Sequence, residues 1–208
     1  VYEKNITLAA AQQLKAKLEA TGRYRAVLTR TRDTSLVLRQ RIEIARHAPA
    51  DIFISLHADS IRDKSVRGLS VYTLSEKASD SEAAALAERE NKADLIIGMD
   101  LTNESREVRN ILIDLAQRES MNLAARLASA LITELKREVT LLRNAHRFAG
   151  FAVLKAPDIP SVLIEMGYLS NREEQNALMK EGYRGKLMNA AVKGLDSYYK
   201  DTQLAQRL

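Results

Sequence analysis

The sequence predicts an α/β fold: a single domain with a mostly parallel central sheet flanked by helices. Short apolar runs rich in β-branched residues alternate along the chain with longer segments of helical periodicity. This alternation is typical of a layered fold around one sheet. The chain has 208 residues, of which 46% are hydrophobic, so it is long enough for one domain with a substantial core and short for two.

Two helices are expected in the first quarter of the chain. Apolar residues recur at every fourth position over 6–18 and a glycine follows, which predicts a helix with one buried stripe and a glycine stop. Thr34 or Ser35 can cap a second helix, whose apolar positions over 38–45 face inward until Pro49 ends it.

Three runs in the first third of the chain predict strands. The first is the short segment YRAVLTR, residues 24–30. The second is DIFISL, residues 51–56, whose nearly continuous apolar and β-branched character predicts a strand buried on both faces. The third is RGLSVYTL, residues 67–74, which alternates well enough for another strand.

The rest of the chain is mostly helical by pattern. Glu, Ala and Leu are dense over 79–93, and a helical period predicts a long helix over about 103–137 and a closing helix over about 183–199. Two short apolar runs, 151–154 and 161–164, are separated by prolines and predict two more strands.

The composition excludes several classes of site and partner. There is no cysteine, so any metal must be held by His, Asp, Glu or water. No apolar run approaches the roughly 18 to 20 residues that cross a bilayer, so no membrane span is expected. The formal charge of +5 would suit an anionic polymer, but three Phe, seven Tyr and no Trp are too few aromatics to favour stacking of nucleic-acid bases.

Three residues are candidates for chemistry. His57 and Glu165 each follow a strongly apolar strand, and ligands of α/β sheets gather beyond the carboxyl ends of the strands. An imidazole there can hold zinc, although a lone histidine is more often structural. A carboxylate after three apolar residues is poorly solvated and needs a cation, a donor or a proton, which suits a general base or a structural partner of an arginine. Glu3, taken alone, is typical of a first-turn acid that suits the helix dipole.

Three segments together resemble a known family. EKNITL (3–8), SLHADS (55–60) and PSVLIEMGYLSN (160–171) are similar, in order and spacing, to three blocks that define the zinc-dependent N-acetylmuramoyl-L-alanine amidases (amidase_3 type). The resemblance implies that Glu3 and His57 are zinc ligands and that Glu165 activates the attacking water. It also implies a glycine-rich block with another histidine ligand about fifteen residues before Glu3, so residues 1–208 are expected to be an N-terminally truncated amidase catalytic domain.

An acidic segment lies within the otherwise basic chain. Residues 76–119 contain eleven acidic and six basic residues. This segment resembles the helical regulatory insertion, here about 79–119, of the cell-division branch of the family, where an inserted helix covers the active site until a partner moves it. The matching stretch is 87–95, and Glu90, or else Glu88, is expected to occupy the open zinc position. An ordinary helix with solvated charges is the alternative.

The function expected from the resemblance is hydrolysis of the amide bond between N-acetylmuramic acid and the L-alanine of the stem peptide. The resemblance implies a periplasmic enzyme that splits septal peptidoglycan during cell division and is released by a LytM-domain activator. Two alternatives differ in class. One is a catalytically inactive wall-binding or regulatory module that lacks a complete metal site, and the other is a basic nucleic-acid-binding domain, which the shortage of aromatics disfavours.

Overall fold

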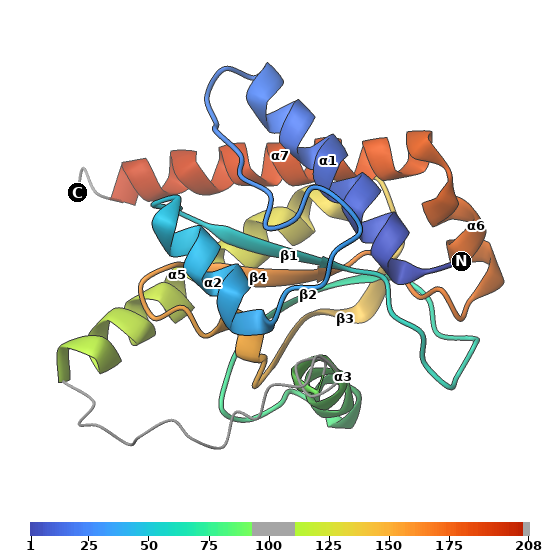
Figure 1. The fold of residues 1–208 in the computed structure, drawn as a ribbon, viewed down its shortest axis with the longest axis horizontal. Coiled ribbons are helices and arrows are strands. Elements are labelled where there is room, and N and C mark those ends of the chain that lie inside the picture. The colour runs from blue at the N-terminus through green and yellow to red at the C-terminus, as the bar shows by residue number, and fades with distance from the viewer. Residues whose placement is uncertain (93–110, 206–208) are drawn as a thin grey trace.

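The computed structural model describes residues 1–92 and 111–205, which form helices packed on both faces of a four-stranded sheet (Figure 1). The helices are α1 (Glu3–Ala20), α2 (Leu38–His47), α3 (Ser81–Asn91), α5 (Ile111–Leu135), α6 (Arg172–Met179) and α7 (Glu181–Ala205). The strands are β1 (Phe53–His57), β2 (Leu69–Leu74), β3 (Leu141–Ala149) and β4 (Ser161–Glu165), and a 3₁₀ turn, η1, spans Ala152–Leu154.

The sheet confirms the predicted fold class. Its strand order is β1-β4-β2-β3, in which β1 pairs with β4 and β2 pairs with β3 in parallel. The central pair, β2 and β4, is antiparallel. At the entry to β2 the chain passes so close to β3 that a Cβ on Gly68 would lie 2.6 Å from the backbone nitrogen of Leu142, and Gly68 also has a positive φ of 117°. Glycine is therefore required at this crossing.

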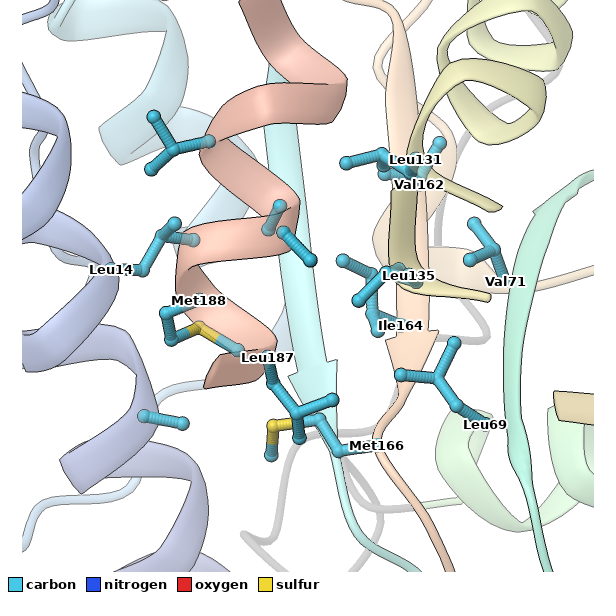
Figure 2. Close-up of a cluster of buried hydrophobic side chains, with 14 of the residues drawn as sticks. Leu14, Leu69, Val71, Leu131, Leu135, Val162, Ile164, Met166, Leu187 and Met188 are labelled. Carbon is cyan, nitrogen blue, oxygen red and sulfur yellow. The ribbon is translucent and has the colours of Figure 1, made fainter. Parts of the chain in front are cut away.

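Two hydrophobic clusters cover the two faces of the sheet. One joins β2 and β4 to α1, α5 and α7, and Figure 2 shows its side chains, including Leu14, Leu131, Ile164 and Leu187. The other cluster lies under α2, α3 and η1 and includes Phe53 and Leu163. Figure 1 shows α1 and α7 on one side of the sheet and α3 on the other. Side chains alternate along each strand, so a residue's position in its strand decides which helices it meets.

The expected strand over 24–30 is wrong. These residues form no ladder and line a cavity that β1 also lines. A strand is defined by hydrogen bonds to a neighbour, and the segment does not reach one in the described residues. The strand expected at 151–154 is also wrong, because residues 152–154 turn as η1.

Two elements were not expected from the sequence, and three helices differ in their bounds. Strand β3 was missed because its sequence, LLRNAHRFA, is polar, as suits an exposed edge. Helix α6 was also missed, although Asn171 caps it by accepting from the backbone N–H groups of Glu173 and Glu174. The helix expected over about 103–137 corresponds to α5, which begins at Ile111 in the described residues; its expected residues 103–110 lie outside them. The helix expected over 79–93 corresponds to α3, and residue 93 also lies outside the described residues. The closing helix α7 begins earlier and ends later than expected.

Candidate metal and catalytic site

The parallel pairing of β1 and β4 brings two of the three predicted site residues together. His57 and Glu165 are the last residues of their strands and are direct partners in the ladder. Because β1 and β4 run in the same direction, their carboxyl ends lie side by side at the same end of the sheet. Residues an even number of positions apart in a strand project from the same face. Phe53 is four residues before His57 and Leu163 is two residues before Glu165, and both belong to the hydrophobic cluster under α2 and α3, so His57 and Glu165 lie on that face.

Glu3 reaches the same place from the first turn of α1. Its Oε1 accepts a hydrogen bond of 3.0 Å from the backbone N–H of Ala58 and lies 3.4 Å from Nδ1 of His57. Burial acts to raise the pKa of Glu3, but the His57 imidazole outweighs it, so the pKa is lowered. The structure therefore places Glu3, His57 and Glu165, which come from three distant segments, in one cluster.

The His57 ring presents one nitrogen to this cluster and uses the other structurally. Its Nε2 lies 2.9 Å from Oγ of Ser55, two residues earlier on the same face of β1. Its Nδ1 is buried without a hydrogen-bond partner, although carboxylate oxygens of Glu3 and Glu90 lie 3.4 and 3.3 Å away. Burial acts to lower the pKa of His57, and the two carboxylates outweigh it and raise the pKa.

Glu165 is completely buried, as its position after an apolar strand predicted. Oε1 accepts a hydrogen bond of 2.8 Å from the backbone N–H of Asp59, while Oε2 is buried without a partner. Burial, and next the charge of Glu3, raise the pKa of Glu165 well above that of an ordinary glutamate. A carboxylate with a raised pKa binds a proton more strongly, which suits a general base that must also return the proton.

Of the two acidic residues proposed in the insertion, Glu90 reaches the cluster and Glu88 does not. Glu90 joins Glu3, His57 and Glu165 at the site. Burial and the charge of Glu3 raise the pKa of Glu90, although the nearby His57 acts to lower it. Glu88 is exposed and pairs at 2.6 Å with Lys92, one turn later on α3. This pairing is the ordinary surface contact expected for a solvated helix face.

Helix α3 is held at the site by the residues on either side of Glu90. Arg89 pairs with Asp59 at 2.6 Å and donates to the backbone oxygen of Ser60 at 3.0 Å. The Asn91 amide donates to the oxygen of Gly150 at 2.9 Å and accepts from the N–H of Ala152 at 2.7 Å. These contacts were missed from the sequence, where only the adjacency of Arg89 and Asn91 to Glu90 could have signalled them.

A large cavity ends at the cluster. It has a volume of about 970 Å³ and lies between α1, the segment 23–36, α2 and β1, with Glu3, His57 and Glu90 among its lining residues. Arg41 of α2 also lines it and acts to lower the pKa of His57, so a guanidinium stands near the imidazole. Three of the four clustered side chains, Glu3, His57 and Glu90, therefore border this cavity.

The donor set of the cluster fits a divalent cation. In the described residues no group of three or more His, Asp or Glu side chains is spaced to hold a metal ion, and carboxylate oxygens of Glu3 and Glu90 lie 3.4 and 3.3 Å from Nδ1 of His57. The buried, unpartnered Nδ1 of His57 is nevertheless a free ligand atom, since Nε2 is occupied by Ser55. Nitrogen from His and oxygen from Glu are ligands that zinc takes in catalytic sites, and a cation would relieve the repulsion between the carboxylates.

Comparison with known proteins decides the family. The model of the N-acetylmuramoyl-L-alanine amidase (amidase_3) family matches residues 1–197, nearly the whole chain. The chain belongs to this family. The amidase domain model thus covers Glu3, His57, Glu90 and Glu165 together, and membership assigns the chain an enzymatic activity, the hydrolysis of peptidoglycan at the bond between N-acetylmuramic acid and L-alanine.

Curated relatives and solved structures agree with this membership. The chain is 37% identical over 198 residues to N-acetylmuramoyl-L-alanine amidase AmiA of Salmonella typhimurium, which covers 95% of the chain and 68% of AmiA. It is 34% identical over 207 residues to AmiC of Escherichia coli, covering 99% of the chain and 49% of AmiC. Among solved structures, the CwlD amidase from Clostridioides difficile in complex with the GerS lipoprotein has a TM-score of 0.69 and 24% identity, covering 96% of the chain and 87% of CwlD, so it supports the fold alone.

The amidase has no membrane-crossing helix among its described residues: none of these helices is both long and apolar enough.

Proposed function

We propose that this amidase is zinc-dependent, that Glu3 and His57 are zinc ligands, and that Glu165 is its general base and acid. The observation that carries the proposal is the convergence of Glu3 and His57, 3.4 Å apart, beside the buried Glu165 at the carboxyl edge of the sheet. The unpartnered Nδ1 of His57 supports its role as the ligand atom. A further histidine ligand ahead of Glu3, implied by the family resemblance, stays a prediction.

An amide resists hydrolysis because water is a poor nucleophile and an amine is a poor leaving group. Zinc, when bound, supplies Lewis acidity that makes water more acidic and polarises a carbonyl. Glu165 takes a proton from the attacking water and delivers it to the alanine nitrogen as the carbon–nitrogen bond breaks. The backbone N–H of Asp59, on Oε1, orients the carboxylate so that Oε2 is the oxygen left for this proton.

The site is proposed to be autoinhibited in the state described. The Glu90 carboxylate lies 3.3 Å from the same imidazole nitrogen that would bind zinc, so it stands where a ligand of the metal would stand. Its side chain is 19% exposed and that of His57 16%, so α3 leaves little access for a large wall polymer on this side. Withdrawal of α3 would open the site, because Glu90, Arg89 and Asn91 all belong to this one helix.

The biological setting is proposed from the relatives. AmiA, AmiB and AmiC amidases of Gram-negative bacteria are among the proteins most similar to this chain, which supports a periplasmic enzyme acting on the cell wall. We propose that it splits septal peptidoglycan during cell division and that a LytM-domain activator moves α3. The named complex of CwlD with a lipoprotein supports the general idea that such amidases bind protein partners.

The experiment that tests the proposal measures metal and product together. The full-length protein is purified without an affinity tag that binds metal, its zinc content is measured by mass spectrometry, and it is incubated with purified peptidoglycan. We expect zinc at about one ion per chain, release of stem peptides with free L-alanine amino termini, loss of this activity on chelation and its return on adding zinc. Full activity of the metal-free protein would refute the zinc dependence, and absence of free L-alanine termini from an activated protein would refute the assigned bond.

A further inference from the structure

The register of the sheet places a third polar residue in line with His57 and Glu165. Glu165 of β4 pairs with His57 on one side and with Ser70 of β2 on the other. Directly paired residues project from the same face of a sheet, with Cβ atoms about 5 Å apart. Ser70 therefore lies next to Glu165, on the face that carries the candidate site, at the centre of the sheet.

Two buried polar atoms of this pair lack a hydrogen-bond partner. Ser70 and Glu165 are both 0% exposed, and the atoms without a partner are Oγ of Ser70 and Oε2 of Glu165. A buried polar group that makes no hydrogen bond costs roughly 1–3 kcal/mol, so such groups call for an explanation. Here one orphan is a donor and the other an acceptor, and they belong to directly paired residues.

The Ser70 hydroxyl has two acceptors in its surroundings, the Tyr72 oxygen and the Glu165 carboxylate. Tyr72 follows Ser70 on the same face and lies close enough for Ser70 to act to lower its pKa, which burial raises. The Tyr72 hydroxyl accepts a hydrogen bond of 3.2 Å from Arg147, and the effect of Ser70 on its pKa is that of a hydroxyl that donates to the Tyr72 oxygen. A serine hydroxyl carries one proton and can rotate, so on this row of the sheet it can donate either to the Tyr72 oxygen or to the Glu165 carboxylate.

We propose that Ser70 is a positioning residue for the amidase reaction: when the site is assembled for catalysis, its hydroxyl donates to the Glu165 carboxylate and holds it at the attacking water. The backbone N–H of Asp59 holds Oε1 of Glu165, and the Ser70 hydroxyl would hold the same carboxylate from the neighbouring strand β2. Two donors on different sides then set the orientation of the carboxylate plane. A side chain held by two donors loses less freedom on reaching the transition state, and precise placement of a base accelerates the proton transfer. This inference rests on the proposed role of Glu165.

The test compares three substitutions at two buried serines. Ser70→Ala, Ser70→Thr and Ser161→Ala are made in the full-length protein carrying Glu90→Ala, so that the proposed block is absent in all of them. Ser161 is the matched control: it lies on β4, is 3% exposed, and its hydroxyl donates to the oxygen of Ile159, away from Glu165. For each variant kcat and KM on soluble muropeptides, zinc content and the unfolding midpoint are measured.

We expect Ser70→Ala to lower kcat about tenfold with KM and zinc content unchanged, the size of losing one hydrogen bond to a charged group. Ser70→Thr keeps the hydroxyl and should recover most of the lost kcat, while Ser161→Ala should keep kcat within about twofold. Tyr168→Phe serves as a second comparison, because the Tyr168 phenol also lies near Glu165, whose charge contributes to raising its pKa.

Three outcomes would overturn the inference. Unchanged kcat in Ser70→Ala removes Ser70 from the reaction, and equal loss in Ser70→Ala and Ser70→Thr shows a packing effect. A loss in Tyr168→Phe with none in Ser70→Ala assigns the donor to Tyr168. The proposed function fails separately: if Glu165→Ala keeps its activity, Glu165 is not the base, whatever Ser70 does.

Discussion

An oxygen of the Glu90 carboxylate lies 3.3 Å from Nδ1 of His57. The contact joins α3 of the acidic segment to the carboxyl end of β1, and it uses the ring nitrogen that has no hydrogen-bond partner. It is a single side-chain contact, held in place by Arg89 and Asn91 next to it. This contact therefore depends on the docking of α3.

Replacing Glu90 by Ala is expected to raise basal hydrolysis of purified peptidoglycan by roughly tenfold or more, because the substitution removes the carboxylate while leaving α3 folded. Glu88→Ala is the matched control: Glu88 is two residues earlier on α3, but it is exposed and pairs with Lys92, so basal hydrolysis should be unchanged. Equal rates in wild type and Glu90→Ala, both folded, would contradict autoinhibition through this residue.

Weakening the docking of α3 is also expected to raise basal hydrolysis. This can be tested at Asn91, which holds α3 but does not contact His57. Asn91→Ala removes both hydrogen bonds, to Gly150 and to Ala152, and should raise basal hydrolysis, by less than Glu90→Ala, since each lost hydrogen bond weakens docking by about 1 kcal/mol. Proteolysis at α3 should quicken in parallel. If hydrolysis stays at the wild-type rate while α3 becomes protease-sensitive, the helix does not control the site.

Substituting Glu165 by Ala is expected to lower hydrolysis by roughly 10²- to 10⁴-fold while zinc content stays at the wild-type level, because general acid–base catalysis contributes factors of this size. The assay is made in the Glu90→Ala background, with binding to peptidoglycan measured by co-sedimentation. Retained hydrolysis would exclude Glu165 as the base, and a loss of zinc would indicate a ligand instead.

Zinc content should fall well below one ion per chain when either proposed ligand is removed. Glu3→Ala and His57→Ala each delete one donor at the centre of the cluster, and loss of a ligand typically weakens a zinc site strongly. His47→Ala is the control, since His47 is exposed at the end of α2 and should leave the zinc content unchanged. Normal zinc content in His57→Ala would place the metal elsewhere.

A pH-dependent part of the stability is expected from the start of α3. Partial burial acts to raise the pKa of Asp80, but Arg147 and the N–H of Ala83 outweigh it and lower the pKa to about 2. The folded pKa lies below the unfolded value of about 3.9, so the ionised form stabilises the fold above that pH and the contribution is lost as the pH falls towards 2. The side chain is 35% exposed, so the contribution at pH 7 is about 1 kcal/mol after solvent screening.

Urea unfolding of Asp80→Asn and wild type at several pH values checks this. The difference in unfolding free energy should be about 1 kcal/mol at pH 7 and about half as large at pH 3. Glu82→Gln, at the second and more exposed carboxylate on Arg147, is the control and should change stability little. A difference that does not shrink on acidification would mean that the charge of Asp80 is not responsible.

Much of the fold could be predicted because it depends on local patterns. The four-residue spacing in α1 and the apolar runs of β1 and β4 specify their own conformation, so these elements were found where expected. Strand β4 is buried throughout, whereas the expected burial of β1 on both faces is wrong, because β1 is an edge strand and only Phe53 of it is buried. Strand β3 forms although it was not expected, and the segment 24–30 forms no strand although one was expected. Both errors have the same cause. Whether an extended segment becomes a strand depends on a neighbour to pair with, which composition does not encode.

The order of amino acids alone singled out His57 and Glu165, because a polar or charged residue at the end of a buried run is anomalous wherever the run folds. The family resemblance added Glu3. Only the tertiary structure decided what these residues meet. The contact of Glu90, the first choice from the sequence, with His57 depends on helix docking, as do the contacts of Arg89 and Asn91. The row formed by His57, Glu165 and Ser70 depends on strand register. Such contacts join segments far apart in the chain, and their geometry is set by the packing of the whole domain rather than by any local pattern.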